Sequence, residues 1–461
     1  MTIIADQTFG LDADGLRDVI AGEVYTPEDA GWDEARLAWN LAADQRPALV
    51  VLAESASDVA AAVRFARANG LRVAPQGTGH GASALALQGD ELLLKTERMR
   101  AVDIDPQAGI ARVEAGVLWM EVTHRAAEFG LAALAGSSPD VGVVGYSLGG
   151  GVGWLARKHG IAANSIVAAE IVTADGSLLR VDADHEPELF WAIRGGGGSF
   201  GVVTALEFRL YPVAEVYAGA LFFPMQRTRE VMQAWREWTA TVDEDVTSTV
   251  RVMQFPPIPD IPEPLRGNAF AIVEATYAGD EAEGAQIVEP LRALGPVMDT
   301  FAVIPAPALQ RLHMDPDHPV PGETDGMLLA ELTAETVDAL VSSAGPDSGS
   351  PLLSVEIRQL GGAVGRPAPG GGALSSIDAP FAMFAVGMAL DPAMQAAVRG
   401  HIDVVKRSLT PWASPRNYLN FSERDADPST FYTPDAYRRL REARRRVDPE
   451  GRFLANHQIA R

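Results

Sequence analysis

The pentapeptide Gly145-Tyr146-Ser147-Leu148-Gly149 has the G-x-S-x-G form that places a nucleophilic serine on a sharp strand-to-helix turn in α/β-hydrolases. Asp448 and His457 follow it in the chain order of a hydrolase triad. However, three glycines in a row, Gly149 to Gly151, occupy the place where the supporting helix should begin. Each costs a helix about 1 kcal/mol relative to alanine. Serine hydrolysis through Ser147 therefore stays an alternative rather than the main interpretation.

A second motif, Gly77-Thr78-Gly79-His80-Gly81, follows a predicted strand at 71–74. Successive glycine N–H groups can form a concave nest that binds an anion, so this loop is suited to hold a phosphate. The spacing is G-x-G-x-G, whereas a nicotinamide Rossmann site needs G-x-G-x-x-G followed by a helix and a ribose-binding acid. The sequence therefore indicates a phosphate-binding loop that is not a nicotinamide site.

The segment HMDPDH at 313–318 brings two histidines and two aspartates together. It lies among prolines and lacks the helical i, i+4 spacing that would place two metal ligands on one face. We therefore expect a solvent-exposed polar turn there and predict no metal site.

Three glycine-rich segments, at 77–81, 149–153 and 195–198, lie within about 125 residues of one another. One phosphate needs one such loop, whereas three indicate a long anionic ligand that the backbone approaches closely at several points. FAD is a ligand of this kind. His80, flanked by glycines, could then attack the 8α-methyl carbon of the flavin through a neutral imidazole nitrogen. A flavin-binding protein without catalytic activity is an alternative from another class.

The composition limits the remaining functions. The chain has 461 residues, with 38 Lys and Arg against 61 Asp and Glu, and its net charge of −23 disfavours nucleic acid as a partner. It contains no cysteine, which excludes disulfides, thiolate catalysis and Cys-ligated metals and favours a cytoplasmic location. No stretch approaches about 18 uncharged apolar residues, so we expect no membrane span.

The chain changes character after about Val213. Before it, a strand at 48–53, a helix at 58–69 and a strand at 71–74 form a βαβ pattern that leads into the first glycine loop. After it, apolar strands alternate with amphipathic helices, which indicates a separate α+β domain. These strands are expected at 217–223, 248–254, 269–277, 352–359 and 381–389, and the helices at 227–241, 280–294, 334–343 and 391–408.

The glycine motifs resemble those of the FAD-linked oxidases of the vanillyl-alcohol oxidase/PCMH superfamily, and within it the bacterial berberine-bridge-enzyme-like oxidoreductases. The resemblance covers about 45–213 and a C-terminal segment, nearly half of the chain. It is carried by PQGTGHG (75–81), by GSSPDVGVVGYSLGGGVGWLARKHGIAANSIVAAEIVTADG (136–176), by ELFWAIRGGGGSFGVVTALEF (188–208), and by NYLNF (417–421) and RRRVDPEGRFLANHQI (444–459).

The resemblance implies an α+β protein. A PCMH-type FAD-binding domain of two α/β subdomains would comprise residues 1–213 and be completed by 412–461. Residues 214–411 would form an inserted α+β substrate domain, an antiparallel sheet covered by helices. The residues that the resemblance places at FAD are His80, Gln76, Gly77, Thr78, Gly79, Gly81, Gly136, Ser137, Ser138, Gly142, Gly145, Tyr146, Gly149, Val202 and Asn420.

Two positions depart from the family pattern. Relatives often carry a cysteine in a G-x-C-P motif that forms a second bond to the flavin, whereas this chain has Ser138 there. We therefore expect one covalent link, through His80. Relatives also often show Y-x-N-Y near the C-terminus, whereas this chain ends that motif with Phe421, which has no hydroxyl.

The activity that follows is an FAD-dependent oxidation in which hydride passes from an alcohol or activated C–H bond to flavin N5. Tyr418 is our candidate for the base that takes the substrate proton. The substrate would be a sugar, a phenolic compound or a natural-product intermediate, held by the inserted sheet, where Arg358 or Gln359 could face it. Dioxygen is the expected acceptor, a dehydrogenase with another acceptor is the alternative, and the chain is expected to act as a monomer or homodimer.

Overall fold

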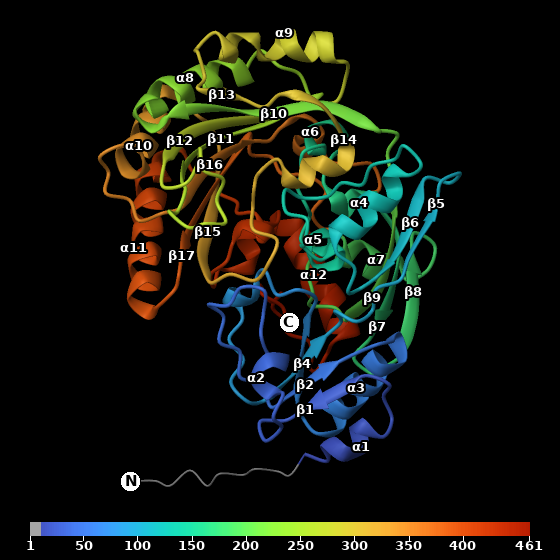
Figure 1. The fold of residues 1–461 in the computed structure, drawn as a ribbon. Helices are drawn as coiled ribbons and strands as arrows, with labels where there is room; N and C mark the ends of the chain where they lie inside the picture. The colour runs from blue at the N-terminus through green and yellow to red at the C-terminus, as the bar shows by residue number, and fades with distance from the viewer. Residues whose placement is uncertain (1–10) are drawn as a thin grey trace.

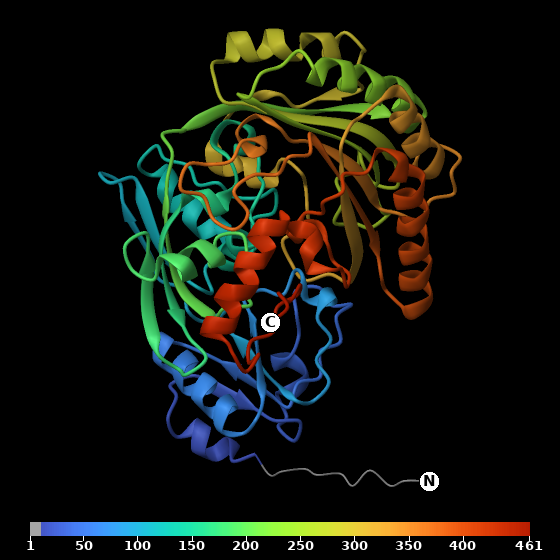
Figure 2. The ribbon, with the colours of Figure 1, turned by 180° about the vertical axis from the view of Figure 1, so that it is seen from behind.

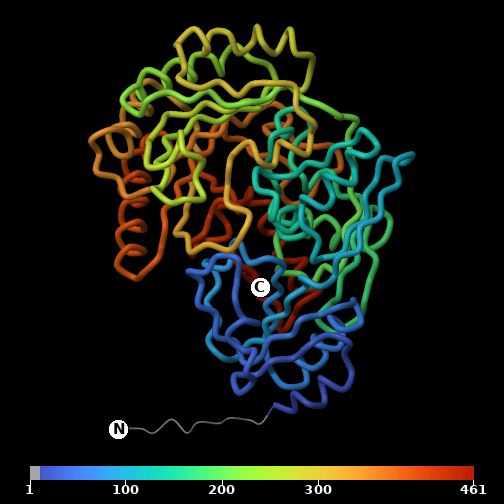
Figure 3. Tube along the Cα trace, in the orientation of Figure 1, coloured from blue at the N-terminus to red at the C-terminus, as the bar shows by residue number. Residues whose placement is uncertain are grey.

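The computed structural model describes residues 11–461, and the first ten residues of the N-terminal segment lie outside it. The fold is mixed α+β, as expected, and contains three β-sheets in the described part of the chain. Figure 1 shows the first sheet at the bottom, the second at the right and a large third sheet at the top. The tube in Figure 3 follows the chain through these sheets in order and then back to the centre of the molecule.

The first sheet has the strand order β1-β2-β4-β3, in which β2 and β3 lie parallel to β4. Its core forms because β2 (LVVL) is buried on both faces and packs against α3. Helix α3 begins where the Ser55 hydroxyl accepts a hydrogen bond from the Asp58 N–H at 3.2 Å. The elements are α1 Ala13–Arg17, β1 Glu23–Tyr25, α2 Trp32–Ala35, β2 Leu49–Leu52, α3 Ala56–Ala68, β3 Arg72–Gln76, η1 Ala82–Ala84 and β4 Glu91–Lys95.

The second sheet has the order β5-β6-β9-β7-β8 and is antiparallel throughout. The second glycine-rich region contains a short helix, α5, which the glycines concealed at the level of sequence. Its buried residues Val143 and Leu148 anchor it in the core. The elements are β5 Val102–Asp105, β6 Ile110–Glu114, α4 Trp119–Ala127, α5 Val143–Leu148, α6 Ala156–His159, η2 Ala162–Ser165, β7 Ile166–Val172, β8 Leu178–Asp182, α7 Pro187–Ile193 and β9 Val202–Arg209.

The third sheet is antiparallel and eight-stranded, in the order β13-β10-β12-β11-β16-β17-β15, with β14 beside β10. Helices α8 to α11 cover its outer side, and its inner side faces the other two sheets (Figure 1). Its strands are β10 Glu215–Pro224, β11 Val246–Gln254, β12 Ala269–Tyr277, β13 Met298–Asp299, β14 Ala302–Pro305, β15 Gly322–Leu329, β16 Ser354–Gln359 and β17 Phe381–Met388. Its helices and short turns are η3 Met225–Arg227, α8 Thr228–Thr239, α9 Glu281–Arg292, η4 Ala306–Arg311, α10 Ala334–Ala344, η5 Gly362–Gly365 and α11 Pro392–Leu409.

Strand β15 was not expected from the sequence, because GETDGMLL carries two acids where an apolar pattern was sought. Both acids are buried, and α11 supplies their partners. Glu323 accepts a hydrogen bond from Arg399 Nε at 2.7 Å, and Asp325 pairs with Lys406. A strand with paired charges in place of apolar residues therefore completes the sheet.

The C-terminal segment returns to the first two sheets. Residues 452–454 add to the free edge of β3: the Val73 N–H donates to the Arg452 carbonyl, and the Leu454 N–H donates to the Val73 carbonyl, each at 2.8 Å. Helix α12 crosses the middle of the molecule beside α7 (Figure 2). The elements are η6 Thr410–Trp412, η7 Leu419–Phe421, η8 Pro428–Phe431 and α12 Pro434–Val447. None of the helices in the described part of the chain has the length and apolar character of a membrane-spanning helix.

Candidate functional site

His80 lies in the loop that leaves the end of β3. Its ring stacks on the Trp39 indole, with ring centroids 3.9 Å apart and an angle of 21° between the planes. Its Nε2 atom is buried and lies 3.5 Å from Asp140 Oδ1. The other carboxylate oxygen, Oδ2, accepts a hydrogen bond from Trp39 Nε1. Among the described residues, Nδ1 of His80 has no hydrogen-bond partner and is not buried, so it is the accessible ring nitrogen.

The conformation of this loop depends on Gly79. Its φ is +87°, and a Cβ atom there would lie 3.0 Å from Gln76 Nε2 and 2.8 Å from the Ala38 Cβ. Glycine therefore fits where a larger residue would be strained. At the start of α5, a Cβ at Gly142 would lie 3.6 Å from Thr78 Cγ2, so the two glycine-rich segments are in close contact.

The segment 136–153 folds around the side chain of Tyr146. Cβ atoms at Gly136 and Gly151 would lie 3.0 and 2.4 Å from its ring. Tyr146 is half-buried, and its hydroxyl is buried without a hydrogen-bond partner among the described residues. Burial raises the pKa of this phenol well above its usual value, so it is protonated at neutral pH.

Asn420, in η7, and Tyr418, just before η7, pack against the other side of the segment 136–153. The Asn420 amide donates to the Tyr146 carbonyl at 3.0 Å, and a Cβ at Gly149 would lie 1.7 Å from Asn420 Oδ1. The Tyr418 hydroxyl accepts a hydrogen bond from the Gly151 N–H at 2.9 Å. Burial raises the pKa of Tyr418 above 10, although the hydrogen bond from the Gly151 N–H acts to lower it.

Val202 lies apart from the other candidates. It is 1% exposed and packs in the core of the first sheet with Val172 and Phe453. Its side chain therefore faces protein, and only its main chain is available to a ligand.

Ser137 and Ser138 are joined to the third sheet. Ser138 Oγ donates to Asp315 Oδ2 at 2.6 Å, and Arg358 Nη2 donates to Ser137 Oγ at 3.3 Å. Arg358 also lies over the ring of Phe421, 5.2 Å from its centroid. The structure thus decides which of two neighbouring side chains faces the glycine-rich segment. Arg358 does, whereas Gln359 points to α8 and donates to the Thr239 carbonyl.

A buried network of charges lies behind Arg358, and the sequence did not reveal it. His313 contacts Glu274 Oε2 through Nδ1 at 2.6 Å and Glu356 Oε2 through Nε2 at 2.8 Å. Glu274 also accepts from Arg251 at 2.7 Å, and Glu356 pairs with Arg358 at 2.5 Å. The expectation of an exposed polar turn is wrong for His313, which is 5% exposed, although His318 is exposed. Among the described residues, no group of three or more His, Cys, Asp or Glu is arranged to hold a metal.

The protonation of His313 makes the stability of the protein depend on pH. Burial and Arg251 lower its pKa, but Glu274, Asp315 and Glu356 outweigh them and raise it from 6.5 to about 9. The ion pairs of His313 are therefore fully present below pH about 6.5 and lost as the pH rises through about 9.

We expect the free energy of unfolding to fall by on the order of 3 kcal/mol across this range. Denaturant titrations at several pH values measure the fall, and the His313→Gln variant is the control, since it should lose this part of the pH dependence. An identical fall in both proteins would contradict the assignment.

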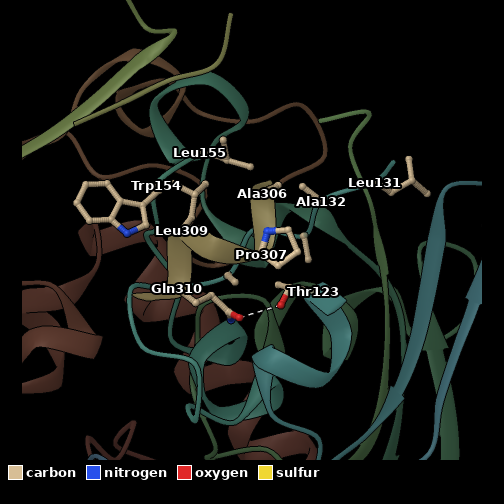
Figure 4. Close-up of a pocket in the computed structure, with 12 residues that line it drawn as sticks. Thr123, Leu131, Ala132, Trp154, Leu155, Ala306, Pro307, Leu309 and Gln310 are labelled. Atoms are coloured by element: carbon tan, nitrogen blue, oxygen red, sulfur yellow. Dashed lines mark hydrogen bonds between the residues drawn. The ribbon is translucent and has the colours of Figure 1, made fainter. Parts of the chain in front are cut away.

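A small apolar pocket lies between α4 and η4, where the second and third sheets meet (Figure 4). The Thr123 hydroxyl donates to Gln310 Oε1 at 2.8 Å across it. Neither His80 nor Tyr418 lines it, so we assign it to the packing between the sheets.

The site has room and polar groups for FAD. Beside Gly145, a Cβ atom would meet no atom within 4 Å, and beside Gly77 it would meet one backbone oxygen at 3.8 Å. The same segments carry three buried polar atoms without a partner among the described residues, namely Gln76 Nε2, His80 Nε2 and the Tyr146 hydroxyl. Open space beside glycine backbone and unpartnered donors fit a long polar cofactor.

The arrangement does not fit a serine hydrolase. Ser147 is 2% exposed and lies inside α5 rather than on a turn after a strand. Asp448 accepts hydrogen bonds from the N–H groups of Arg452 and Phe453, and His457 Nε2 contacts the Ser422 carbonyl. Within the described residues no hydrogen bond joins these three side chains into a triad.

Comparison with known proteins identifies the family. A family model described as an FAD binding domain matches residues 47–182. The chain is 30% identical over 468 residues to (R)-6-hydroxynicotine oxidase of Paenarthrobacter nicotinovorans, covering 95% of this chain and 97% of that protein. The chain belongs to the FAD-linked oxidases of the vanillyl-alcohol oxidase/PCMH superfamily.

Solved structures agree with this assignment. This chain matches the crystal structure of 6-hydroxy-D-nicotine oxidase from Arthrobacter nicotinovorans with a TM-score of 0.81 at 26% identity. The match covers 96% of this chain and 98% of that one. BBE-like 1 of Physcomitrella patens shares the fold, with a TM-score of 0.85 at 20% identity over 97% and 98% of the two chains. The protein is thus an FAD-linked oxidoreductase, and the expected family, fold and cofactor are confirmed.

Proposed function

We propose that the enzyme is an oxidase that holds FAD covalently through His80 and oxidises an alcohol or activated C–H bond of a small organic molecule. The observation that carries the proposal is the convergence of three segments distant in sequence. The segment 136–153 contacts the His80 loop on one side and the pair Tyr418 and Asn420 on the other, and open space lies beside Gly77 and Gly145.

The residues proposed to hold FAD are those that the family resemblance named. The main chain of 76–81 and the segment 136–149 would hold the pyrophosphate, and Asn420 would lie near the flavin. Ser138 would support the loop through Asp315 rather than bond the flavin. We also propose the boundaries 1–213, 214–411 and 412–461, supported by the third sheet, which begins at Glu215 and whose last helix ends at Leu409.

When bound, FAD supplies the two-electron acceptor, taking a hydride at N5. The chain provides the proton acceptor, for which Tyr418 is our candidate. Because burial raises its pKa, Tyr418 is protonated when the site is at rest. To act as the base, Tyr418 must first release its phenolic proton to solvent, and the nearby Arg358 and the Gly151 N–H favour the phenolate that this leaves.

Replacing Tyr418 by phenylalanine is expected to lower kcat by about 10²- to 10⁴-fold, the contribution of a general base. Its flavin content should stay the same, since the ring still packs against Gly150. Steady-state kinetics together with the flavin absorbance measure both quantities. Tyr25→Phe, which removes a hydroxyl bonded to exposed Glu23, is the matched control. Wild-type turnover in Tyr418→Phe would exclude the phenol as base.

The test of the function itself is anaerobic reduction of the purified protein. A panel of hydroxylated N-heterocyclic amines, oligosaccharides and phenolic alcohols is added without oxygen, and bleaching of the flavin reports a substrate. Hydrogen peroxide formed on admitting air identifies an oxidase, whereas slow reoxidation identifies a dehydrogenase. A flavin that no compound bleaches would favour a non-catalytic binding protein.

We also propose an electron acceptor, an oligomeric state and a cellular location for the enzyme. Dioxygen is the electron acceptor, as for the oxidases that the chain resembles. The enzyme acts as a monomer or homodimer. A cytoplasmic location is proposed because the chain contains no cysteine that an oxidising compartment could pair.

A further inference from the structure

We propose that Asp140, held by Trp39, is the positioning residue that fixes the tautomer of His80 and thereby activates Nδ1 to bond the flavin. This inference rests on the proposed covalent link through His80. It concerns Trp39, which lies outside the motifs described above, and Asp140, which lies within the motif at 136–176 but has no role assigned there; the two are 101 positions apart in the chain.

The three side chains form a closed group. Trp39 lies flat on the imidazole of His80 and donates its indole N–H to Asp140 Oδ2. The second carboxylate oxygen, Oδ1, is buried without a hydrogen bond and lies 3.5 Å from His80 Nε2, which is likewise buried without one. Two buried atoms without hydrogen-bond partners among the described residues thus lie within ion-pair distance of each other. A small rotation of the imidazole would bring them to hydrogen-bond distance, as catalytic contacts often tighten when the ligand binds.

The chain holds this group rigidly from three sides. The Trp39 N–H donates to the Thr78 carbonyl at 2.9 Å, which fixes the indole against the loop that carries His80. The next residue, Asn40, exchanges hydrogen bonds of 3.0 and 3.1 Å with the main chain of Gly322 in β15. Asp140 itself is 6% exposed. The carboxylate therefore cannot turn away to solvent.

The chemistry of a histidine nucleophile requires this partner. A neutral imidazole carries one N–H and one lone pair, and the group bonded to one nitrogen decides which nitrogen keeps the lone pair. A carboxylate beside Nε2 keeps the proton there, so the lone pair resides on Nδ1, the accessible nitrogen. The same carboxylate stabilises the positive charge that develops on the ring when Nδ1 attacks.

The bond formation balances with dioxygen as oxidant. A bond forms between Nδ1 and the 8α carbon, one hydrogen leaves that carbon as a proton, and the Nε2 proton is released after the attack. The two electrons of the broken C–H bond remain on the flavin, which is thereby reduced. Dioxygen takes up these two electrons and two protons and becomes hydrogen peroxide, leaving the linked flavin oxidised.

The test compares rates of covalent attachment. Full-length apo-protein from a riboflavin-auxotrophic host is mixed with FAD in air, and the flavin that stays with acid-precipitated protein is followed with time. We expect Asp140→Asn to slow attachment by about 10- to 100-fold, the effect of removing the carboxylate that orients a metal-bound histidine. Trp39→Phe keeps the aromatic stack but removes the N–H, so a smaller loss is expected. Asp103→Asn, on the exposed side of β5, is the control.

Two further readouts separate positioning from a structural role. The dissociation constant of FAD before attachment and the Tm of the apo-protein should be the same in Asp140→Asn as in the wild type. A variant that attaches flavin at the wild-type rate overturns the inference, and so does one whose slow attachment is matched by lost affinity or stability. If the wild type itself attaches no flavin, the proposed His80 link fails. If it does attach flavin and Asp140→Asn keeps pace, only the role of Asp140 fails.

Discussion

His80→Ala is expected to release all of its flavin when the protein is denatured, whereas the wild type keeps its flavin in the acid-precipitated pellet. The reason is that nothing else in the chain can replace the imidazole. The chain has no cysteine, and the hydroxyl of Ser138, at the position where relatives carry one, donates its hydrogen bond to Asp315. A neutral serine hydroxyl is a weak nucleophile, and a hydrogen bond to a carboxylate leaves its proton in place.

The measurement is the flavin absorbance of pellet and supernatant, supported by the mass of the intact chain, which should increase by one FAD in the wild type only. His185→Ala, at an exposed histidine that pairs with Asp182, is the matched control and should keep its flavin. Because the proposed FAD contacts are largely with main chain, His80→Ala should still bind FAD reversibly. Flavin in the pellet of His80→Ala would place the link on another residue.

The parts of the site that could be predicted from the sequence are those with a local signal. The loop at 77–81 is recognisable because its glycines and the strand before it are neighbours in the chain, and the same holds for 149–153. Trp39 and Asp140 had no such signal, since each looks ordinary alone and only the fold brings them to His80. Contacts of this kind depend on tertiary packing, which spacing along the chain does not encode.

In the fold, too, the elements with a local sequence signal were predicted and those that depend on tertiary contacts were not. Strands with apolar alternation, such as those at 246–254 and 269–277, were placed within a few residues. Strand β15 was missed because its residues that face α11 are acids, and their partners on that helix are more than sixty residues away. His313 was misjudged for a related reason: the prolines around it indicated an exposed turn, but Glu274 and Glu356 from distant strands, together with the neighbouring Asp315, compensate its charge and allow burial.

The second large effect is expected from the network that surrounds His313. Glu274→Ala should lower the free energy of unfolding by about 3–5 kcal/mol, the usual cost of leaving buried charges without their partner. The Glu274 side chain is fully buried, and its loss would leave both Arg251 and His313 without their nearest carboxylate. Denaturant unfolding followed by tryptophan fluorescence is suited to the measurement, since Trp235 and Trp238 lie in the core of the same sheet.

Glu281→Ala is the matched control, because Glu281 is exposed in the first turn of α9, and a surface change of this kind costs less than about 0.5 kcal/mol. Glu274→Gln should fall between the two, since the amide can still bond Thr249 but no longer balances the positive charges. Equal stability of Glu274→Ala and the control would mean that the network contributes little to folding.

Because Asp315 and Arg358 in this network hold Ser138 and Ser137, Glu274→Ala should also weaken reversible FAD binding, although residue 274 itself lies in the third sheet, away from the glycine-rich segments. The charged network thus connects the stability of the third sheet to the shape of the flavin site.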